Sequence, residues 1–451
     1  MKNINLSMKS VIRLLWLLLL GICIANVFST DFNNIYIDIS VIFTFLCIAI
    51  ISLINIFKDK TPYSLNKTFW YFNLIFFFIA PIIQYSSGYS VWNYNLNNAS
   101  YLKTNLIILL SEIVFMLFYR KINKEDIISQ EKITIKTKSI VKAILFASSI
   151  LCLIIVIRNI GFVSLFSREE NAYSISGDGM FNTIFTHLLK CIPVYAFFVI
   201  YSEKNKITIS SLIILVIVFL LNFPISTTRF WMGAIYIGIF LIVFNKKSKE
   251  NRTYDILILL IFMIFFSLLY AFKFHDLSYF MDKGFDIKNF KESYNSVDYD
   301  AYSIIPRSFD YVKENGIVYG RQLIGTVLFI IPRSIWTSKP YPTGELIVAS
   351  QGQAYTNVSC PLLAEGYINF GIIGMILFQV ILAIICSKLD NNYWKSKKNN
   401  IYIKFLYPFL MGFLIFLERG ALHPVVIYLF CFSIPLIFTI LFNIIRKVRK
   451  I

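Results

Sequence analysis

Long apolar stretches of close to 20 residues alternate with short polar segments along most of this chain. A helix of about 20 residues crosses the ~30 Å hydrocarbon core of a bilayer. A transmembrane β-barrel would instead show short alternating segments. We therefore expect an all-α polytopic membrane protein with a single integral domain over residues 1–451. Its twelve predicted spans are residues 12–28, 35–57, 68–85, 102–119, 140–157, 181–201, 207–223, 230–245, 254–272, 361–386, 402–417 and 425–445.

One long polar segment, residues 273–360, interrupts this pattern between the ninth and tenth predicted spans. It carries nine basic and nine acidic side chains, and an apolar stripe from Tyr302 to Val312 predicts a short helix within it. Residues 158–180 form a second, smaller polar loop. A simple anchor or channel needs no such segment, whereas an enzyme acting on a substrate held at the membrane face does.

The lysines and arginines predict the orientation, because cytoplasmic loops of membrane proteins are enriched in both. With the N-terminus in the cytoplasm, 28 of the 43 basic residues fall on cytoplasmic segments. Both termini are then cytoplasmic, and the loops 158–180 and 273–360 are external. The long loop is neutral overall, so the net charge of +18 lies on segments that face anionic lipid.

Composition agrees with this interpretation and excludes other classes. The chain is 57% hydrophobic and 15% charged, whereas soluble domains are about half apolar and about a quarter charged. The placement of the basic residues indicates membrane lipids as partners and excludes nucleic acid. The seven cysteines and three histidines show no C-x-x-C or zinc spacing, so no metal or cofactor is predicted.

Arg229 is the first candidate for anion binding. It follows Pro224-Ile225-Ser226-Thr227-Thr228 at the outer end of the seventh span. An arginine at that depth is costly unless it pairs or serves an anion, and a planar guanidinium suits bidentate contact with phosphate oxygens. The alternative is an interfacial arginine that anchors the span.

A second basic group lies in the string Ile331-Pro332-Arg333-Ser334-Ile335-Trp336, which is followed by Lys339. Arg333 and Lys339 are candidates to hold a pyrophosphate, and Trp336 offers a stacking surface for a sugar. The alternative is a cationic, aromatic turn at the membrane interface. The same loop holds two further candidate residues, Arg307 and Arg321.

Glu365 is the candidate general base. It follows Pro361 among apolar neighbours at the outer end of the tenth span. Burial disfavours the charged form of a carboxylate and makes proton acceptance near neutral pH plausible. The alternative is an acid that favours the helix macrodipole. Tyr367 follows it as a candidate substrate contact.

Two more groups of polar residues are candidates at the ends of spans or inside them. Arg419 and His423 lie at the last outer turn, where a local Glu418–Arg419 ion pair is the favoured structural alternative. Glu112 and Lys190 lie inside spans, where charged groups usually pair within the bundle. We expect a structural Glu112–Lys190 pair, with a proton or ion path as the alternative.

These residues resemble those of Wzy-type polymerases of O-antigen or capsular oligosaccharide repeat units. The many-span layout with a large late outer loop covers the whole chain, and the residue-level similarity covers about 229–374. Four motifs carry the resemblance: Thr227-Thr228-Arg229, Pro332-Arg333-Ser334-Ile335-Trp336, Lys339-Pro340 with Gly344-Glu345, and Pro361-Leu362-Leu363-Ala364-Glu365-Gly366-Tyr367-Ile368-Asn369-Phe370-Gly371.

The resemblance implies a GT-C-like, inverting and metal-independent glycosyltransferase in the bacterial inner membrane, with both polar loops in the periplasm. The donor would be a growing glycan on undecaprenyl pyrophosphate, and the acceptor one lipid-linked repeat unit. A chain-length regulator protein is a further expected partner. Positive charge must face the leaving pyrophosphate, which favours Arg229 and Arg333, then Arg307, Arg321 and Arg419. Glu365 is the expected base, with His275 and His423 in reserve.

Two alternatives stay open. A lipid-linked oligosaccharide flippase has the same span number, but it should show two related halves and short loops. An O-antigen ligase resembles these polymerases but carries a His-Asn signature, where this chain has Cys360-Pro361.

Overall fold

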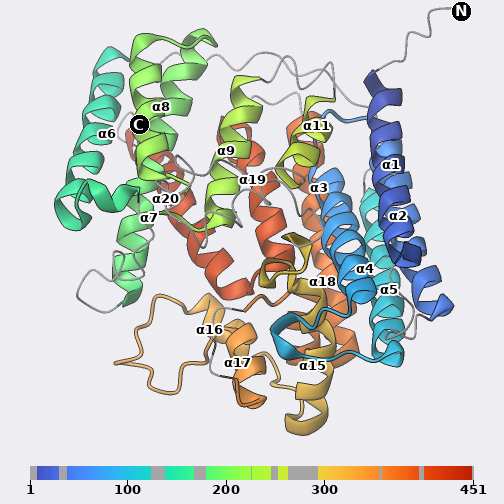
Figure 1. The fold of residues 1–451 in the computed structure, drawn as a ribbon. Helices are drawn as coiled ribbons and strands as arrows, with labels where there is room; N and C mark the ends of the chain where they lie inside the picture. Colours follow the sequence, from blue (N-terminus) through green and yellow to red (C-terminus); the bar gives the residue numbers. More distant parts are fainter. Residues whose placement is uncertain are drawn as a thin grey trace, which may run out of the picture.

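The computed structural model describes residues 8–29, 38–122, 138–166, 179–224, 226–244, 252–262, 293–353, 355, 358–395 and 401–448. Their regular structure is entirely helical (Figure 1). The α-helices are α1 (Met8–Ser29), α2 (Ile39–Lys58), α3 (Leu65–Phe72), α4 (Ala80–Ser87), α5 (Asn98–Ile122), α6 (Ser139–Ile160), α7 (Gly179–Lys204), α8 (Ile209–Leu221), α9 (Arg229–Val243), α11 (Thr253–Leu260), α15 (Ala301–Asn315), α16 (Arg321–Val327), α17 (Thr343–Ser350), α18 (Leu362–Trp394), α19 (Ile401–Arg419) and α20 (Leu422–Val448). A π-helical segment, η1 (Asn73–Ile79), joins α3 to α4, and short 3-10 turns are η2 (Val91–Asn93), η3 (Val163–Leu165) and η5 (Val297–Tyr299).

Six helical segments of the described residues are long and apolar enough to cross a membrane. They are Ile39–Lys58, Leu65–Ser87, Asn98–Ile122, Ser139–Ile160, Ile184–Lys204 and Leu362–Trp394. The predicted all-α class is confirmed for the described residues, and these helices support a membrane protein. The number of twelve spans, the GT-C-like architecture and the orientation stay predictions.

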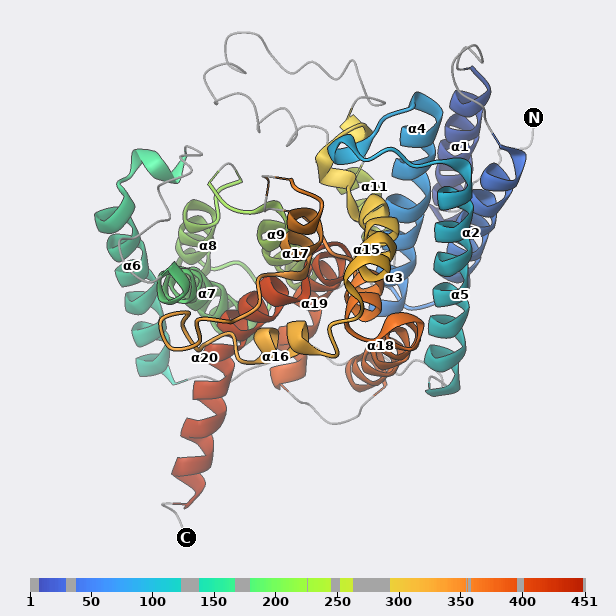
Figure 2. The ribbon, with the colours of Figure 1, turned by 90° about the horizontal axis from the view of Figure 1, so that it is seen from below.

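The helices form a broad bundle. Helices α6, α7 and α8 lie on one side, and α1, α2 and α5 lie on the other (Figures 1 and 2). Helices α9, α19 and α3 lie between them. The short helices α15, α16 and α17 lie together at one end of the bundle, which we call the α15–α17 end. The turn between α7 and α8 lies at the opposite end.

Helices α9 and α19 pack tightly along each other in an antiparallel register. A Cβ added at Gly412 would lie 2.3 Å from the Cα of Ala234, so the two backbones are in contact. Phe230 stacks on Phe416 with ring centroids 5.3 Å apart. These two contacts place the first residue of α9 beside the last residues of α19, at the α15–α17 end.

Helix α18 contains a sharp reversal that its apolar sequence does not predict. Phe370 and Gly371 leave helical geometry, and Gly371 adopts φ 64° and ψ −150°, a conformation that favours glycine. A Cβ added at Gly374 would lie 2.0 Å from the carbonyl oxygen of Gly366. Residues eight apart in a straight helix are about 12 Å apart along its axis. The first two turns of α18 therefore fold back onto the start of its long segment.

The described part of the long polar loop, residues 293–353, 355 and 358–360, carries short helices as predicted. Helix α15 includes the expected stripe from Tyr302 to Val312, and Ile304 and Ile305 are fully buried. Helix α16 is short, and Phe329, two residues beyond its end, packs on α20. Predictions about residues 273–292, including His275, and about residues 167–178 lie outside the described residues, as does the ninth predicted span beyond residue 262.

Candidate active site

Arg229 begins α9 and forms an ion pair with the long loop. Its Nη1 lies 2.6 Å from Oδ2 of Asp298 in η5. The Arg229 side chain is 13% exposed and that of Asp298 is 19% exposed. The ion pair orients the guanidinium, and part of its surface stays accessible to an anion. The register of α9 on α19 fixes the position of this arginine, because both helices end at the same level.

Arg419 ends α19 and binds the same loop. Its Nη2 donates to Oδ1 of Asp300 over 2.9 Å, and its Nε donates to the carbonyl of Asp298 over 3.1 Å. Its guanidinium carbon lies 4.8 Å from the centre of the Phe230 ring. Asp298 and Asp300 therefore join the first residue of α9 to the last residue of α19.

Asp300 is a fully buried carboxylate, and both of its oxygens accept hydrogen bonds. Its Oδ2 accepts from the indole nitrogen of Trp92 at 3.0 Å and from the backbone N–H of Ser359 at 3.2 Å. Three segments distant in sequence thus meet on one side chain that immediately precedes α15. Removing this acceptor would leave three donors without their partner.

The predicted Glu418–Arg419 ion pair is wrong. Arg419 pairs with Asp300 instead, because residues adjacent on a helix point to different faces. Glu418 is buried, and its Oε1 has no hydrogen-bond partner among the described residues.

The predicted Glu112–Lys190 pair is also wrong. Glu112 on α5 accepts from the Ser52 hydroxyl at 3.2 Å, whereas Lys190 on α7 donates to Thr227 over 3.2 Å. Helices α5 and α7 lie on opposite sides of the bundle (Figures 1 and 2). Lys190 thereby supports the segment that leads to Arg229.

Glu365 is buried, and both its carboxylate oxygens accept hydrogen bonds. Thr343, at the start of α17, donates to Oε2 over 2.7 Å, and the backbone N–H of Leu422, at the start of α20, donates to Oε1 over 2.9 Å. The reversal in α18 carries Glu365 to this position. Two donors hold the carboxylate in one orientation, and it also satisfies a backbone N–H of the first turn of α20.

The turn between α19 and α20 connects these groups. Arg419 precedes it, Leu422 contacts Glu365, and His423 follows. Phe329, whose carbonyl accepts from Lys339, packs on Ile427 and Cys431 of α20, so the basic group of the long loop lies against the helix that follows this turn. The structure therefore brings Arg229, Arg419 and Glu365 to one region through shared contacts, and the basic group packs on the helix that begins there.

The segment after α16 is folded by its own basic side chains. Nζ of Lys339 donates to the carbonyls of Phe329 at 2.7 Å and Ile331 at 2.9 Å. Burial and then the charge of Arg333 lower the pKa of Lys339. Arg333 is exposed, donates to the carbonyls of Lys339 and Pro340, and lies 4.0 Å from the Tyr341 ring centre. Arg333 is thus the accessible cation of the pair.

Three other candidates lie nearby without joining this network. Trp336 donates from its indole nitrogen to Ser338 over 3.1 Å, and exposed Arg321 donates to the carbonyl of Ser338 over 3.0 Å. Tyr367 packs against the ring of Phe309 with centroids 4.9 Å apart.

Arg307 occupies a different environment from the other candidates. It is 1% exposed, and it donates to the carbonyl of Trp92 over 2.9 Å and to the hydroxyl of Tyr355 over 3.1 Å. Its guanidinium carbon lies 4.5 Å from the centre of the Tyr94 ring. Through these contacts, the Arg307 side chain holds the segment around η2 against α15. Little of its guanidinium surface is left for a substrate.

Sequence reasoning missed Asp298 and Asp300, which bind the two arginines. In the sequence both acids are only two charges of a balanced loop, and no local pattern marks them. Their spacing, with one residue between them just before a predicted helix, is the one available signal.

The arrangement provides arginines for binding a phosphorylated group and an oriented carboxylate for accepting a proton. Comparisons with protein families, with characterised proteins and with solved structures find no match to this chain.

Proposed function

We propose that this protein polymerises lipid-linked oligosaccharide repeat units at the outer face of a bacterial inner membrane. It transfers a growing glycan from undecaprenyl pyrophosphate to the non-reducing end of a second lipid-linked repeat unit. The resemblance of residues 229–374 to Wzy-type polymerases suggests this reaction. The contacts among the described residues supply the physical support.

One observation carries the proposal. The turn between α19 and α20 joins the Arg419–Asp300 and Arg229–Asp298 pairs to the oriented carboxylate of Glu365 at the α15–α17 end. A phosphoryl-binding group and a proton acceptor are the two elements that a glycosyl transfer from a diphosphate donor requires.

In the proposed reaction, the acceptor hydroxyl oxygen forms a bond to the anomeric carbon of the donor sugar. The bond between that carbon and the pyrophosphate oxygen breaks, and its electron pair leaves with undecaprenyl pyrophosphate. Glu365 takes the hydroxyl proton. Arg229 and Arg333 face the charge that develops on the leaving group, where fixed cations lower the barrier most.

The ion pair of Arg229 is consistent with this role. A pyrophosphate that approaches the guanidinium competes with Asp298 for its N–H groups, and the acid orients the arginine before substrate binds. Arg333 is exposed and offers a second cation with backbone-fixed geometry. Such preorganised donors need little rearrangement when charge develops.

The test uses a strain whose own copy of this protein is replaced by variants, with surface glycan length read on a gel. Arg229→Ala and Arg333→Ala should abolish polymer and leave single repeat units, whereas Lys313→Ala should keep the wild-type ladder. Lys313 is an exposed cation at the same end, on α15. Normal ladders in both arginine variants, at normal protein levels, would show that Arg229 and Arg333 do not bind the pyrophosphate.

A further inference from the structure

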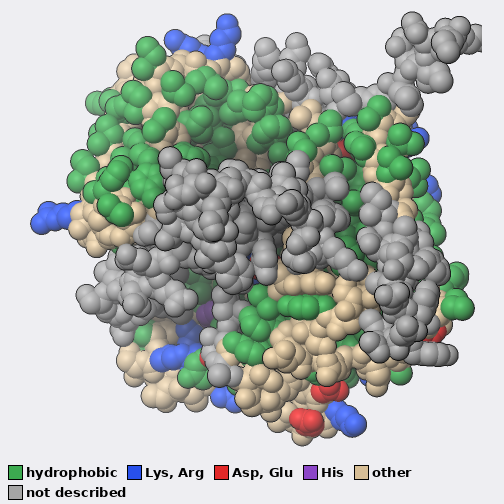
Figure 3. All heavy atoms as spheres, viewed as in Figure 1, with side chains coloured by type: hydrophobic (Ala, Val, Ile, Leu, Met, Phe, Trp, Pro, Cys, Tyr) green, Lys and Arg blue, Asp and Glu red, His purple; other side chains and the backbone are tan. Residues whose placement is uncertain are grey.

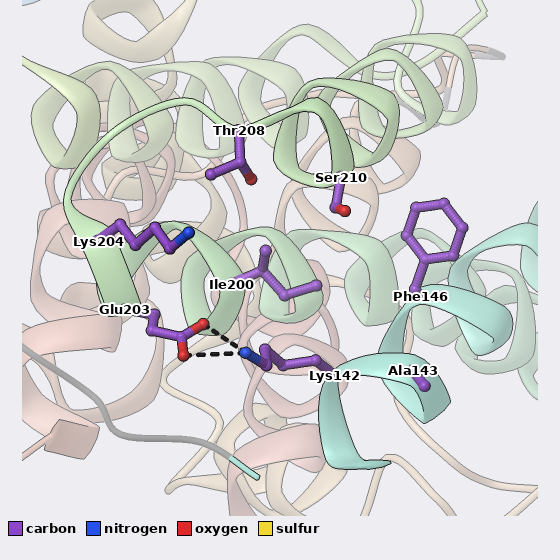
Figure 4. Close-up of a pocket in the computed structure, with 8 residues that line it drawn as sticks. All are labelled: Lys142, Ala143, Phe146, Ile200, Glu203, Lys204, Thr208 and Ser210. Carbon is purple, nitrogen blue, oxygen red and sulfur yellow. Dashed lines mark hydrogen bonds and ion pairs between the residues drawn. The ribbon is translucent and has the colours of Figure 1, made fainter. Parts of the chain in front are cut away.

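A cavity of about 380 Å³ lies between α6, α7 and α8, at the end of the bundle opposite α15–α17. Its size falls in the range of roughly 300–1,000 Å³ that is typical of small-ligand sites. Its lining residues are Lys142, Ala143, Phe146, Ile200, Glu203, Lys204, Thr208 and Ser210 (Figure 4). None of these residues belongs to the proposed polymerase site.

The cavity carries a net positive charge. Nζ of Lys142 donates to both oxygens of Glu203, at 2.9 and 2.8 Å, so this carboxylate is neutralised in place. Lys204 also lines the cavity, and among the described residues its ammonium group has no hydrogen-bond or ion-pair partner. Thr208 and Ser210 add hydroxyl groups to the wall (Figure 4). Donors of this kind suit a phosphodiester.

The surroundings of the cavity are apolar and exposed. Ile140 and Ile144 on α6 are 68% and 61% exposed, and Ile209 and Leu212 on α8 are 80% and 50% exposed. Figure 3 shows hydrophobic side chains gathered over this side of the molecule. A polar cavity beside an apolar surface suits a ligand that has a charged headgroup and hydrocarbon chains. In other membrane proteins, basic pockets between transmembrane helices bind lipid headgroups.

We infer that this cavity binds one anionic phospholipid, with its phosphodiester at Lys204 and its acyl chains along α6 and α8. The Lys142–Glu203 pair forms the opposite wall and fixes the distance between α6 and α7. The ligand is a membrane lipid of the leaflet at this end, which the basic residues predict to be cytoplasmic. This site is independent of the proposed glycosyl transfer.

The test is native mass spectrometry of the full chain in detergent, titrated with dioleoyl phosphatidylglycerol. Lys204→Ala should weaken binding about fivefold, the factor for roughly 1 kcal/mol per lysine near an anionic headgroup. Ala143→Trp, which fills the cavity without changing charge, should also lower the bound fraction.

Two matched controls should bind as the wild type does. Lys206→Ala removes an exposed lysine of the same turn that does not line the cavity, and Leu117→Trp enlarges an exposed side chain on α5, on the other side of the bundle. Equal affinity of Lys204→Ala and Lys206→Ala would overturn the site.

Three further compounds test which part of the lipid the cavity recognises. Phosphatidylethanolamine should bind more weakly than phosphatidylglycerol, and equal binding of both would overturn recognition of an anionic lipid. Glycerophosphoglycerol and inorganic phosphate should not displace the lipid. Their binding with the same affinity would mean a soluble phosphate site and would contradict the lipid assignment.

Discussion

Asp300→Asn is expected to destabilise the protein, although it changes only one atom. In the native site, Oδ1 accepts from Arg419, and Oδ2 accepts from Trp92 and from the backbone N–H of Ser359. An amide supplies one acceptor oxygen and one donor group. Whichever way the asparagine is turned, its NH₂ therefore faces at least one donor.

The magnitude follows from burial. Removing one partner of a buried ion pair costs about 3–5 kcal/mol, because the other charge stays in place without compensation. Arg419 keeps hydrogen bonds to the carbonyls of Val297 and Asp298, which favours the lower end of that range. We therefore expect a loss of about 3 kcal/mol. The entropy of unfolding is roughly 2.1 cal/mol/K per residue. If the whole chain unfolds cooperatively, this loss lowers the midpoint temperature of thermal unfolding by about 3 °C.

The assay is thermal unfolding of purified protein in nanodiscs, followed by tryptophan fluorescence at a fixed scan rate, since membrane proteins of this size often unfold irreversibly. Glu314→Gln is the matched control. It removes the same charge from an exposed position on α15 and should change stability by less than about 0.5 kcal/mol. An unfolding midpoint for Asp300→Asn within about 1 °C of the control would refute the assignment of Asp300 as the buried partner of Arg419.

Two further substitutions probe the chemistry and the chain reversal. Glu365→Gln keeps an acceptor for Leu422 N–H and a partner for Thr343, so the midpoint should stay near wild type while polymerisation falls at least about 100-fold; near-normal rates would remove Glu365 as the base. Gly374→Ala places a Cβ 2.0 Å from the Gly366 carbonyl oxygen and should cost about 1–3 kcal/mol or prevent accumulation. Gly233→Ala, whose Cβ would meet nothing within 4 Å, should be neutral or stabilising, and equal midpoints for the two alanine variants would contradict the reversal.

The helix positions were predictable from sequence because the bilayer imposes a strong constraint on apolar run length. All twelve predicted spans overlap helices of the described residues, and the stripe from Tyr302 to Val312 lies in α15 as expected. Hydropathy does not detect the reversal at Phe370 and Gly371, since the apolar run continues through it. The close contact between Gly374 and Gly366 of the same helix likewise has no signal in the sequence, because these residues would lie far apart in a straight helix.

The site was only partly predictable. Arg229 is a sequence-based candidate because a charged side chain at a span end is costly without a partner, and Glu365 is one because burial disfavours a charged carboxylate. No local pattern marks the acidic partners, since Asp300 and Arg419 lie 119 residues apart and meet only where the residues before α15 pack against the end of α19. For Arg307, the charge suggests a ligand contact, whereas the structure buries the side chain and uses its hydrogen bonds to hold backbone carbonyls.

The most direct test of the proposed polymerase is the surface glycan of a strain that lacks this protein. Loss of a polymerase leaves export and attachment intact, so we expect a single repeat unit on the surface. Complementation with the wild-type chain should restore the ladder. Complete absence of surface glycan would instead indicate a flippase or a ligase and would contradict the account.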